Sequence, residues 1–264
     1  MITNLQNQKK KSIVRLQQKS SERKSNKKFV IEGKREISIA QNSGFDIFEI
    51  YLCQDIFTED PSYPINIVSN KVIPVSSDVY NKLAYRKNVE GIIALASIKE
   101  TGLSYITLSS NPLLLILETL EKPGNLGAIL RTADAAGVDA VIVCDLKTDL
   151  YNPNVIRSSL GCVFSNQVVV CGAKDVINWL NKNQFSIYAA TPEADNSYYA
   201  ADYNKPTALV FGAESEGLTK QWEKALIQNI SIPMKGKIDS LNVSVSVGVI
   251  LYEVIRQRNA ITNH

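Results

Sequence analysis

An unbroken apolar run at residues 113–117 (LLLIL) constrains the fold more than any other part of the sequence. A strand that is apolar on both faces is typical of a parallel sheet that helices cover on both sides. After this run, strand-like segments alternate with segments of helical spacing. The predicted strands are 140–144, 167–170, 186–190, 207–211 and 229–232, and the predicted helices are 127–136, 155–160, 174–181 and 243–258. This alternation predicts an α/β domain with a mostly parallel sheet, which binds ligands beyond the carboxyl ends of its strands.

A smaller α/β unit is predicted before this domain. Its segments are a turn leading into a helix at 29–40, strands at 46–53, 72–75 and 91–98, and a helix that Ser76, Ser77 and Asp78 can cap and that runs through Tyr85. A polar stretch follows, in which 105–108 could pair as an edge strand. We therefore expect a basic arm at 1–28, a small domain at 29–99, a linker at 100–111 and the larger domain at 112–264.

The first 28 residues carry the basic charge of the chain. They contain nine lysine and arginine residues and one acid, whereas the whole chain has a net charge of +3, so the remaining residues are net acidic. A basic arm on a mildly acidic body indicates a polyanionic partner such as a nucleic acid, and a solvated tail is the alternative. Because the arm is polar and has few apolar residues to bury, we expect it to be helical only in part.

The scarce residue types exclude several kinds of chemistry. The single histidine, His264, is the last residue, so catalysis that needs an oriented imidazole is excluded. The cysteines Cys53, Cys144, Cys162 and Cys171 lack metal-ligand spacing and are expected to be small buried apolar residues. No apolar run is long enough for a membrane span, and no secretory signal follows the N-terminal lysines. We therefore expect a cytoplasmic protein without a metal site.

Polar, glycine-containing loops follow three of the apolar strands. The first, 121–131 (EKPGNLGAILR), turns at Pro-Gly and begins a helix that Asn125 can cap, with Arg131 about one and a half turns further on. The second, 211–218 (FGAESEGL), places Glu214 between glycines, which lets the backbone approach a ligand closely. Taken alone, the first loop fits a capped helix with a structural arginine, and the second is a weak signal.

The third loop, 232–248, leads into the last helix. Ser240, Asn242 and Ser244 lie near the predicted start of that helix, where their dipoles could meet a ligand. Ordinary helix capping is the alternative interpretation.

Together and in this order, the three loops resemble the three sequence motifs of the SpoU/TrmH branch of the SPOUT RNA methyltransferases. Residues 29–33 (FVIEG) and 91–94 (GIIA) resemble the start and end of the family's small substrate-binding domain, which is similar to ribosomal proteins that bind kinked RNA. Residues 152–161 (NPNVIRSSLG) resemble a family segment that faces RNA. The resemblance covers nearly the whole chain.

The resemblance implies a fold, a cofactor and a reaction. The larger domain would contain a deep trefoil knot that binds S-adenosylmethionine, largely through backbone groups of Gly212, Ile232 and Leu241, and Thr191 would line the same pocket. The reaction would methylate a ribose 2′-hydroxyl of structured RNA, with ribosomal RNA as the first choice and transfer RNA as the second. The protein would form a homodimer through the knotted domain, with helices near 127–136 and 243–258 in or near the interface, and it would need no metal.

The resemblance also implies roles for single residues. Arg131 would be the central catalytic residue, and the residues arranging the site and the RNA would be Asn125, Glu214, Ser240, Asn242 and Ser244. A guanidinium has a pKa above about 12 and is a poor base, so we expect Arg131 to stabilise the developing alkoxide while a phosphate or water accepts the proton. The residues expected to contact RNA are Lys27, Lys28, Arg35, Asn154 and Arg157.

Two other classes of protein are weighed against this interpretation. A knotted RNA-binding protein without activity would share the fold, but loss of Arg131 or Asn125 would favour it and both are present. A nucleotide-binding enzyme of the Rossmann type would need a G-x-G-x-x-G turn and an acid at the right distance, which the sequence lacks.

Overall fold

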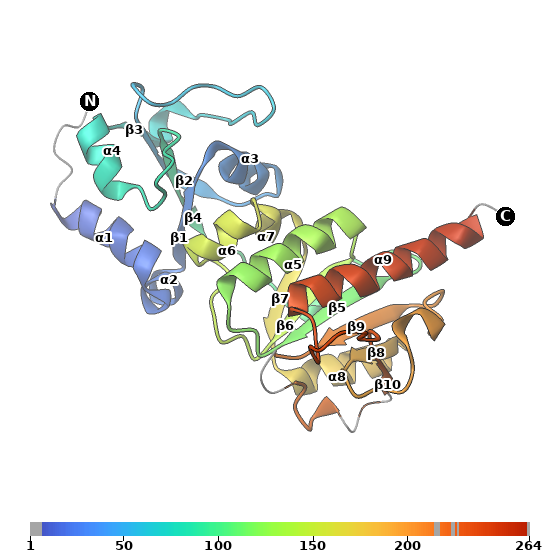
Figure 1. Ribbon diagram of the computed structural model, residues 1–264. Helices are drawn as coiled ribbons and strands as arrows, with labels where there is room; N and C mark the ends of the chain where they lie inside the picture. Colours follow the sequence, from blue (N-terminus) through green and yellow to red (C-terminus); the bar gives the residue numbers. More distant parts are fainter. Residues whose placement is uncertain (1–6, 214–216, 223–224, 226, 263–264) are drawn as a thin grey trace. The chain divides into compact units, whose positions relative to one another are not determined.

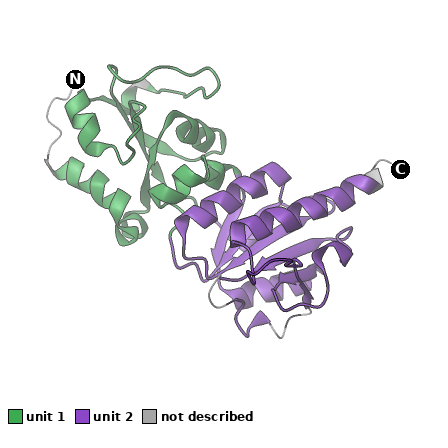
Figure 2. Cartoon of the chain, in the orientation of Figure 1, with its two compact units in different colours: residues 1–100, 149–165 green, residues 101–148, 166–264 purple. Residues whose placement is uncertain are grey.

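The computed structural model describes residues 7–213, 217–222, 225 and 227–262, and the chain divides into two compact units. Unit 1 contains residues 1–100 and 149–165, and unit 2 contains residues 101–148 and 166–264 (Figure 2). Unit 1 is therefore built from two separate stretches of chain. No helix within the described ranges has both the length and the apolar character of a membrane span.

Unit 1 is a four-stranded sheet with helices around it. The strand order is β1-β4-β2-β3, with β4 antiparallel to β1 and β2, and β3 parallel to β2. The strands are β1 (Lys28–Glu32), β2 (Ile47–Leu52), β3 (Val72–Pro74) and β4 (Ile92–Ser97). The helices are α1 (Asn7–Gln18), α2 (Ser20–Asn26), α3 (Lys34–Asn42), α4 (Ser77–Leu83), α6 (Pro153–Ser158), α7 (Cys162–Ser165) and the 3-10 turn η1 (Ser69–Lys71).

The structure corrects the prediction of a turn at 29–33. This segment is strand β1, whose residues pair with β4 from Lys28 opposite Ser97 to Glu32 opposite Ile93. Phe29 and Ile31 are fully buried. The strand ends at Gly33, whose φ of +111° suits glycine, and α3 follows at once.

The basic N-terminal segment packs into unit 1 through two helices. We expected helix only in part, but α1 and α2 cover residues 7–18 and 20–26. Ile13 and Leu16 are buried in the core of unit 1. Arg23 is only 2% exposed, and its Nε donates to Asp149 Oδ2 at 3.0 Å. This ion pair joins the helical segment to the second stretch of unit 1.

Unit 2 contains a six-stranded sheet in the order β10-β8-β9-β5-β6-β7, and every pairing is parallel. The predicted parallel α/β sheet is therefore confirmed. The strands are β5 (Leu113–Glu118), β6 (Ala140–Cys144), β7 (Val168–Cys171), β8 (Ser186–Ala190), β9 (Thr207–Phe211) and β10 (Ile227–Ile230). The helices are α5 (Pro123–Ala136), α8 (Ala173–Lys182) and α9 (Val243–Thr262), with 3-10 turns η2 (Leu103–Tyr105) and η3 (Tyr198–Ala200).

Helices cover both faces of this sheet (Figure 1). On one face, Val176 and Leu180 of α8 pack in a core with Ile116 of β5. On the other face, α5 and α9 lie side by side (Figure 1), and Gly248 of α9 lies close to the Thr132 side chain of α5. Because both faces are covered, all six residues of β5 are buried, as the apolar run predicted.

Unit 2 differs from the prediction in several places. Helix α5 begins at Pro123, so Lys122 is the N-cap residue and Asn125 lies inside the first turn; the prediction that Asn125 caps this helix was wrong. Strand β10 covers Ile227–Ile230 and begins two residues earlier than predicted. No strand forms at 105–108; the side-chain amide of Gln167 instead pairs with both backbone groups of Thr107, at 2.9 and 2.8 Å.

Candidate functional site

A cavity of about 630 Å³ lies in unit 2 where β8 and β9 end. The last residues of both strands line it, as do β10 and the loops that follow all three strands. The carboxyl edge of the parallel sheet is thus hollowed, which is where an α/β sheet is expected to bind its ligand. Helix α9 begins beside the cavity, because Val243 and Ser246 belong to its lining.

The cavity brings together the residues predicted to bind a cofactor. Thr191, Gly212, Ile232 and Leu241 all line it, and so does Ser240. They come from three different loops, so the fold gathers residues that are spread over 50 positions of the sequence, from Thr191 to Leu241. Their role in binding stays a prediction, and their shared location assigns that predicted role to this one cavity.

Gly212 allows a close crossing of the chain at the cavity wall. A Cβ atom at this position would lie 2.3 Å from the carbonyl carbon and oxygen of Gly217 and 2.6 Å from the Leu218 nitrogen. Real Cβ atoms do not approach backbone so closely, so a side chain at residue 212 would displace the loop after β9. Glu214, which the sequence placed in this loop as a site residue, lies outside the described residues.

A buried carboxylate anchors the end of the same loop. Glu118, the last residue of β5, is fully buried. Its two oxygens accept hydrogen bonds from the backbone N–H and the hydroxyl of Thr219, at 2.8 and 2.7 Å. Thr219 lines the cavity, so Glu118 fixes the cavity wall to the central strand.

Three predicted catalytic residues form one polar cluster at the start of α9. The Asn242 side chain accepts from the Ser244 backbone N–H at 3.0 Å and from its hydroxyl at 2.6 Å. Asn242 Nδ2 also donates to Asn125 Oδ1 at 3.3 Å, which connects α9 to the first turn of α5. The cluster neighbours the cavity, since Leu241 and Val243 on either side of Asn242 line it.

Arg131 stands apart from this cluster. It lies six residues beyond Asn125, about 9 Å further along α5, and its side chain is exposed. It is not among the described residues that line the cavity, and its side chain has no hydrogen bond or ion pair with another described residue. Within one chain, the Arg131 guanidinium therefore does not belong to the cavity wall.

The five residues predicted to contact RNA all lie in unit 1. Asn154 and Arg157 contact each other on α6, where Arg157 Nη2 donates to Asn154 Oδ1 at 3.2 Å. Lys28 and Arg35 lie over aromatic rings, 4.6 and 4.7 Å from the ring centroids. Lys27 is exposed, with its Nζ 3.8 Å from a Glu100 carboxylate oxygen.

Neither the cysteines nor other metal-ligating side chains form a metal site within the described residues. Cys53 and Cys144 are buried, while Cys162 and Cys171 are half-buried, and none of the four forms a disulfide. Burial raises the pKa of the Cys171 thiol to about 11. No group of three or more metal-ligating side chains occurs within the described part of the chain.

Sequence reasoning missed Trp222, which lines the cavity, and Glu118, which anchors its wall. Glu118 ends an otherwise apolar strand, and a carboxylate in that position was the signal that it must be buried and hydrogen-bonded. Trp222 lines the cavity and is 2% exposed, but its neighbours in the sequence carry no motif. Only the fold shows that both residues belong to the site.

Comparison with known proteins finds two family models that match successive parts of the chain. The SpoU rRNA Methylase family model matches residues 112–252, and the MRM3-like substrate binding domain model matches residues 7–94. The 23S rRNA (guanosine-2′-O-)-methyltransferase RlmB of Ralstonia nicotianae is 33% identical over 72% of this chain and 79% of its own length.

Solved structures agree with these matches over nearly the whole chain. An RNA 2′-O ribose methyltransferase is 38% identical with a TM-score of 0.81, covering 98% of this chain and 99% of that one. The SpoU methyltransferase AviRb from Streptomyces viridochromogenes, in complex with AdoMet, is 25% identical with a TM-score of 0.86, covering 97% and 99%. The chain therefore belongs to the SpoU rRNA methylase family of RNA 2′-O-ribose methyltransferases.

Proposed function

We propose that this protein transfers a methyl group from S-adenosylmethionine to a ribose 2′-hydroxyl of ribosomal RNA. The observation that carries the proposal is the hydrogen-bonded cluster of Asn125, Asn242 and Ser244 beside the cavity of unit 2. Membership of the SpoU family and the 23S rRNA activity named for the Ralstonia relative support the same reaction and substrate class.

The cavity has the chemistry that S-adenosylmethionine needs. Two carboxylates, Glu193 and Asp239, belong to its described lining, and no lysine, arginine or histidine does. Such a lining favours a ligand with sulfonium and ammonium charges over a phosphate-bearing nucleotide. Nε1 of Trp222 is buried without a hydrogen-bond partner among the described residues, so a ligand acceptor could satisfy it. The volume of about 630 Å³ is in the usual range for cofactor sites.

The residues around the cavity would align the RNA and stabilise charge. The bound cofactor supplies an electrophilic methyl group. Asn242, held by Ser244 and Asn125, would position the ribose, because its own orientation is fixed by hydrogen bonds. Arg131 would stabilise the negative charge that develops as the hydroxyl loses its proton to a phosphate or water. Ser240, at the cavity, and Glu214 would help to arrange the site.

We propose that the protein is a homodimer that pairs α5 and α9 of two chains. The outer face of α9 exposes two large apolar side chains, Val245 at 50% and Tyr252 at 53%. Arg131 is exposed on α5 and does not line its own cavity, so a partner chain would complete the site. The change Tyr252→Glu should place a charge in this interface, and sedimentation analysis should show monomers of the variant where the native protein is dimeric.

We also propose that the carboxyl-terminal part of unit 2 forms the family's trefoil knot. The loop after β8 and the loop after β10 run beside each other, since Ser231 exchanges hydrogen bonds with Asn196 and Tyr198 at 2.8 and 2.9 Å. The chain then returns from the sheet edge to place α9 against α5. This path supports the proposed knot, in which the chain after β10 would pass through the loop after β8.

Unit 1 would hold the RNA, in the manner of ribosomal proteins that bind kinked RNA. It contains 17 basic and 12 acidic residues, whereas unit 2 contains 12 and 14. Lys27, Lys28, Arg35 and Arg157 would contact phosphates, so affinity should fall as salt rises. The arm at 1–28 and the domain at 29–99 would act together, with 100–111 leading to the methyltransferase domain at 112–264. Within that last range, residues 149–165 belong to unit 1 and would take part in holding the RNA. We further propose that the reaction takes place in the cytoplasm.

The proposed function is tested by mapping ribose methylation. Ribosomal RNA from cells with the gene, without it and with Arg131→Ala should be compared at every 2′-O-methyl position. We expect one methylation to be absent both without the gene and with the variant. Unchanged methylation in ribosomal RNA of cells without the gene would contradict the proposal.

A further inference from the structure

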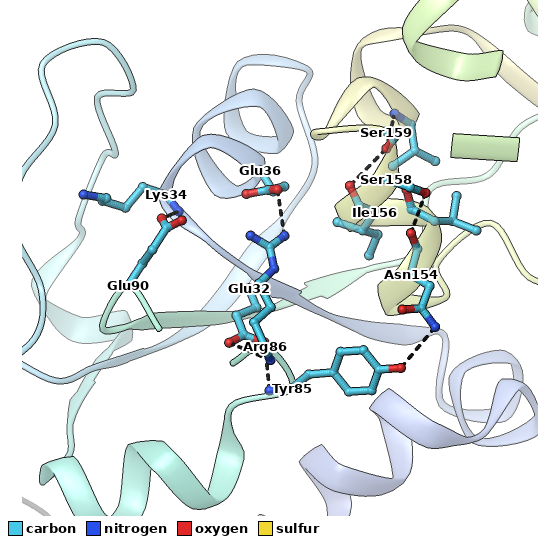
Figure 3. Close-up of polar contacts among 12 residues, drawn as sticks. Glu32, Lys34, Glu36, Tyr85, Arg86, Glu90, Asn154, Ile156, Ser158 and Ser159 are labelled. Carbon is cyan, nitrogen blue, oxygen red and sulfur yellow. Dashed lines mark hydrogen bonds and ion pairs between the residues drawn. The ribbon is translucent and has the colours of Figure 1, made fainter. Parts of the chain in front are cut away.

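Tyr85 presents an exposed ring that is held at both ends. The residue lies between α4 and β4 in unit 1 and is 42% exposed. Its backbone N–H donates to Glu32 Oε2 at 2.9 Å, and its phenolic oxygen accepts from Asn154 Nδ2 at 3.1 Å (Figure 3). The two hydrogen bonds come from segments that are distant in the sequence, and they fix the orientation of a partly exposed ring.

The backbone anchor of Tyr85 is itself rigid. Glu32 belongs to β1 and is 8% exposed, and its carboxylate also accepts from the Arg86 backbone N–H at 3.2 Å. The Arg86 guanidinium donates to Glu36 Oε1 at 2.7 Å (Figure 3). Gly33 leaves room for this pair, because a Cβ atom there would lie 2.3 Å from Glu36 Oε2 and 2.7 Å from Arg86 Nη1. The tyrosine is therefore displayed by a preformed scaffold.

The surroundings of the ring are basic. The two segments that meet at Tyr85, residues 82–88 and 152–158, contain four basic residues and no acid. Lys87 and Arg157 are exposed, and Arg157 Nη2 is hydrogen-bonded to the same Asn154 that holds the tyrosine. Glu36 neutralises Arg86, its ion-pair partner, so the basic charge at the surface comes from Lys82, Lys87 and Arg157.

We propose that Tyr85 is a stacking platform for one unpaired nucleobase of the RNA, with Arg157 and Lys87 on the flanking phosphates. An aromatic ring among basic side chains is the combination that holds single-stranded nucleic acid. The exposed charged side chains next to the ring, Lys87 and Arg157, are basic, which favours RNA over an apolar peptide. Because the ring is already anchored, little side-chain freedom is lost on binding. The inference rests on the proposed function, which supplies RNA as the substrate.

The first test compares three changes at Tyr85 with one matched control. The probe is protein-free ribosomal RNA purified from cells without the gene, in which the target ribose is unmethylated. Tyr85→Leu should lower the affinity about 10-fold, since loss of one stacked base costs about 5- to 150-fold. Tyr85→Trp and Tyr85→Phe keep a ring and should lose clearly less affinity than Tyr85→Leu, with any loss in Tyr85→Phe reporting the missing Asn154 anchor. The control Tyr105→Leu removes a tyrosine of unit 2 that is 71% exposed, and it should change nothing.

Two further measurements separate stacking from a structural role. Ultraviolet irradiation of the native complex should crosslink a nucleotide to the peptide that contains Tyr85. Lys87→Gln should lower the slope of log affinity against log salt concentration by about one, which corresponds to the loss of one phosphate contact. Binding of S-adenosylhomocysteine, measured by calorimetry, should be the same for Tyr85→Leu and the native protein, because the cavity belongs to unit 2.

The outcomes distinguish this inference from the proposed function. Undiminished RNA affinity of Tyr85→Leu overturns the stacking platform, and methyl transfer by the native protein would then still stand. A 10-fold loss at Tyr85 without methyl transfer to any ribosomal RNA keeps the platform and overturns the function. If Tyr85→Leu does not fold, the crosslink decides, because its absence from the Tyr85 peptide of the native complex overturns the inference.

Discussion

Glu118 shows how a single buried side chain can organise a binding site. Burial of a carboxylate is costly unless hydrogen bonds replace its water. Thr219 supplies both replacements, so the cavity wall cannot shift without leaving one oxygen unsatisfied. The neighbouring loop leads into α5, which carries Asn125 and Arg131. One residue therefore ties the proposed cofactor wall to the strand that precedes the proposed catalytic helix.

Removal of this anchor should weaken the cofactor site. Thr219→Val leaves one Glu118 oxygen buried without a donor, at a cost of about 1–3 kcal/mol. We expect S-adenosylhomocysteine to bind about tenfold more weakly to Thr219→Val and to Glu118→Ala, as measured by calorimetry. Asp175→Asn, an exposed change on α8, serves as the control. Equal affinity in all four proteins would show that the wall does not depend on Glu118.

The ion pair between Arg23 and Asp149 should matter mainly for stability. Both residues are less than 10% exposed, and Arg23 also donates to the Leu16 carbonyl. Asp149→Asn should lower the free energy of unfolding by about 3 kcal/mol, because the guanidinium stays buried without its charge partner. Denaturant unfolding measures this. The exposed pair of Lys9 and Glu49 is the comparison, and Lys9→Met should cost less than about 1 kcal/mol. A similar cost for both changes would contradict the argument.

Among the elements, those with strong local patterns could be predicted from the sequence and those defined by distant partners could not. Strand β5 is apolar throughout, and its place in a covered parallel sheet followed from that. Strand β1 was taken for a turn, because its five residues acquire their partners only in β4, some sixty residues later. The start of α5 was misplaced because Pro123 fits a turn as well as the first turn of a helix.

The same limit applies to the site. The sequence located the loops that line the cavity, because their glycines and polar residues follow apolar strands. It could not locate Glu118 or Trp222 there, since Glu118 meets Thr219 across 101 positions of sequence. Nor could it tell that Arg23, one of nine basic residues in the arm, is buried rather than available to RNA.

The loop after β9 offers a test at the level of an element. Gly212→Ala would force the backbone at Gly217 away from its close crossing. We expect this variant to lose S-adenosylhomocysteine binding by more than about tenfold while unit 1 keeps its affinity for RNA. Gly236→Ala is the matched control, because a Cβ atom there would meet nothing within 4 Å. Calorimetry on both variants checks the prediction, and tight binding by Gly212→Ala would mean that the crossing can relax.

At the scale of the whole molecule, the notable feature is that unit 1 is not continuous in sequence. Phe29, in the first stretch, stacks on Tyr151 in the second with 4.2 Å between ring centroids, and Phe164 lies 5.8 Å away. Residues 149–165 also supply Asp149 to the buried ion pair. The core of unit 1 is therefore complete only when both stretches are present.

A fragment that ends at residue 100 should consequently fail to fold. It would leave Phe29 without its aromatic neighbours and Arg23 without Asp149, and large apolar surfaces are costly to expose. We expect such a fragment to lack a near-ultraviolet circular dichroism signal. A second fragment, in which residues 149–165 follow residue 100 through a flexible linker, should regain it. A well-folded fragment 1–100 would contradict this expectation.

The divided unit also sets an order of events during translation. When residue 100 has left the ribosome, β1 to β4 have all been made, but the aromatic core still waits for residues 149–165. At roughly 5–20 residues per second, the nascent chain carries this open apolar surface for several seconds while the first strands of unit 2 appear. During synthesis the protein should thus depend on ribosome-associated chaperones more than a protein in which each domain is one continuous stretch of sequence.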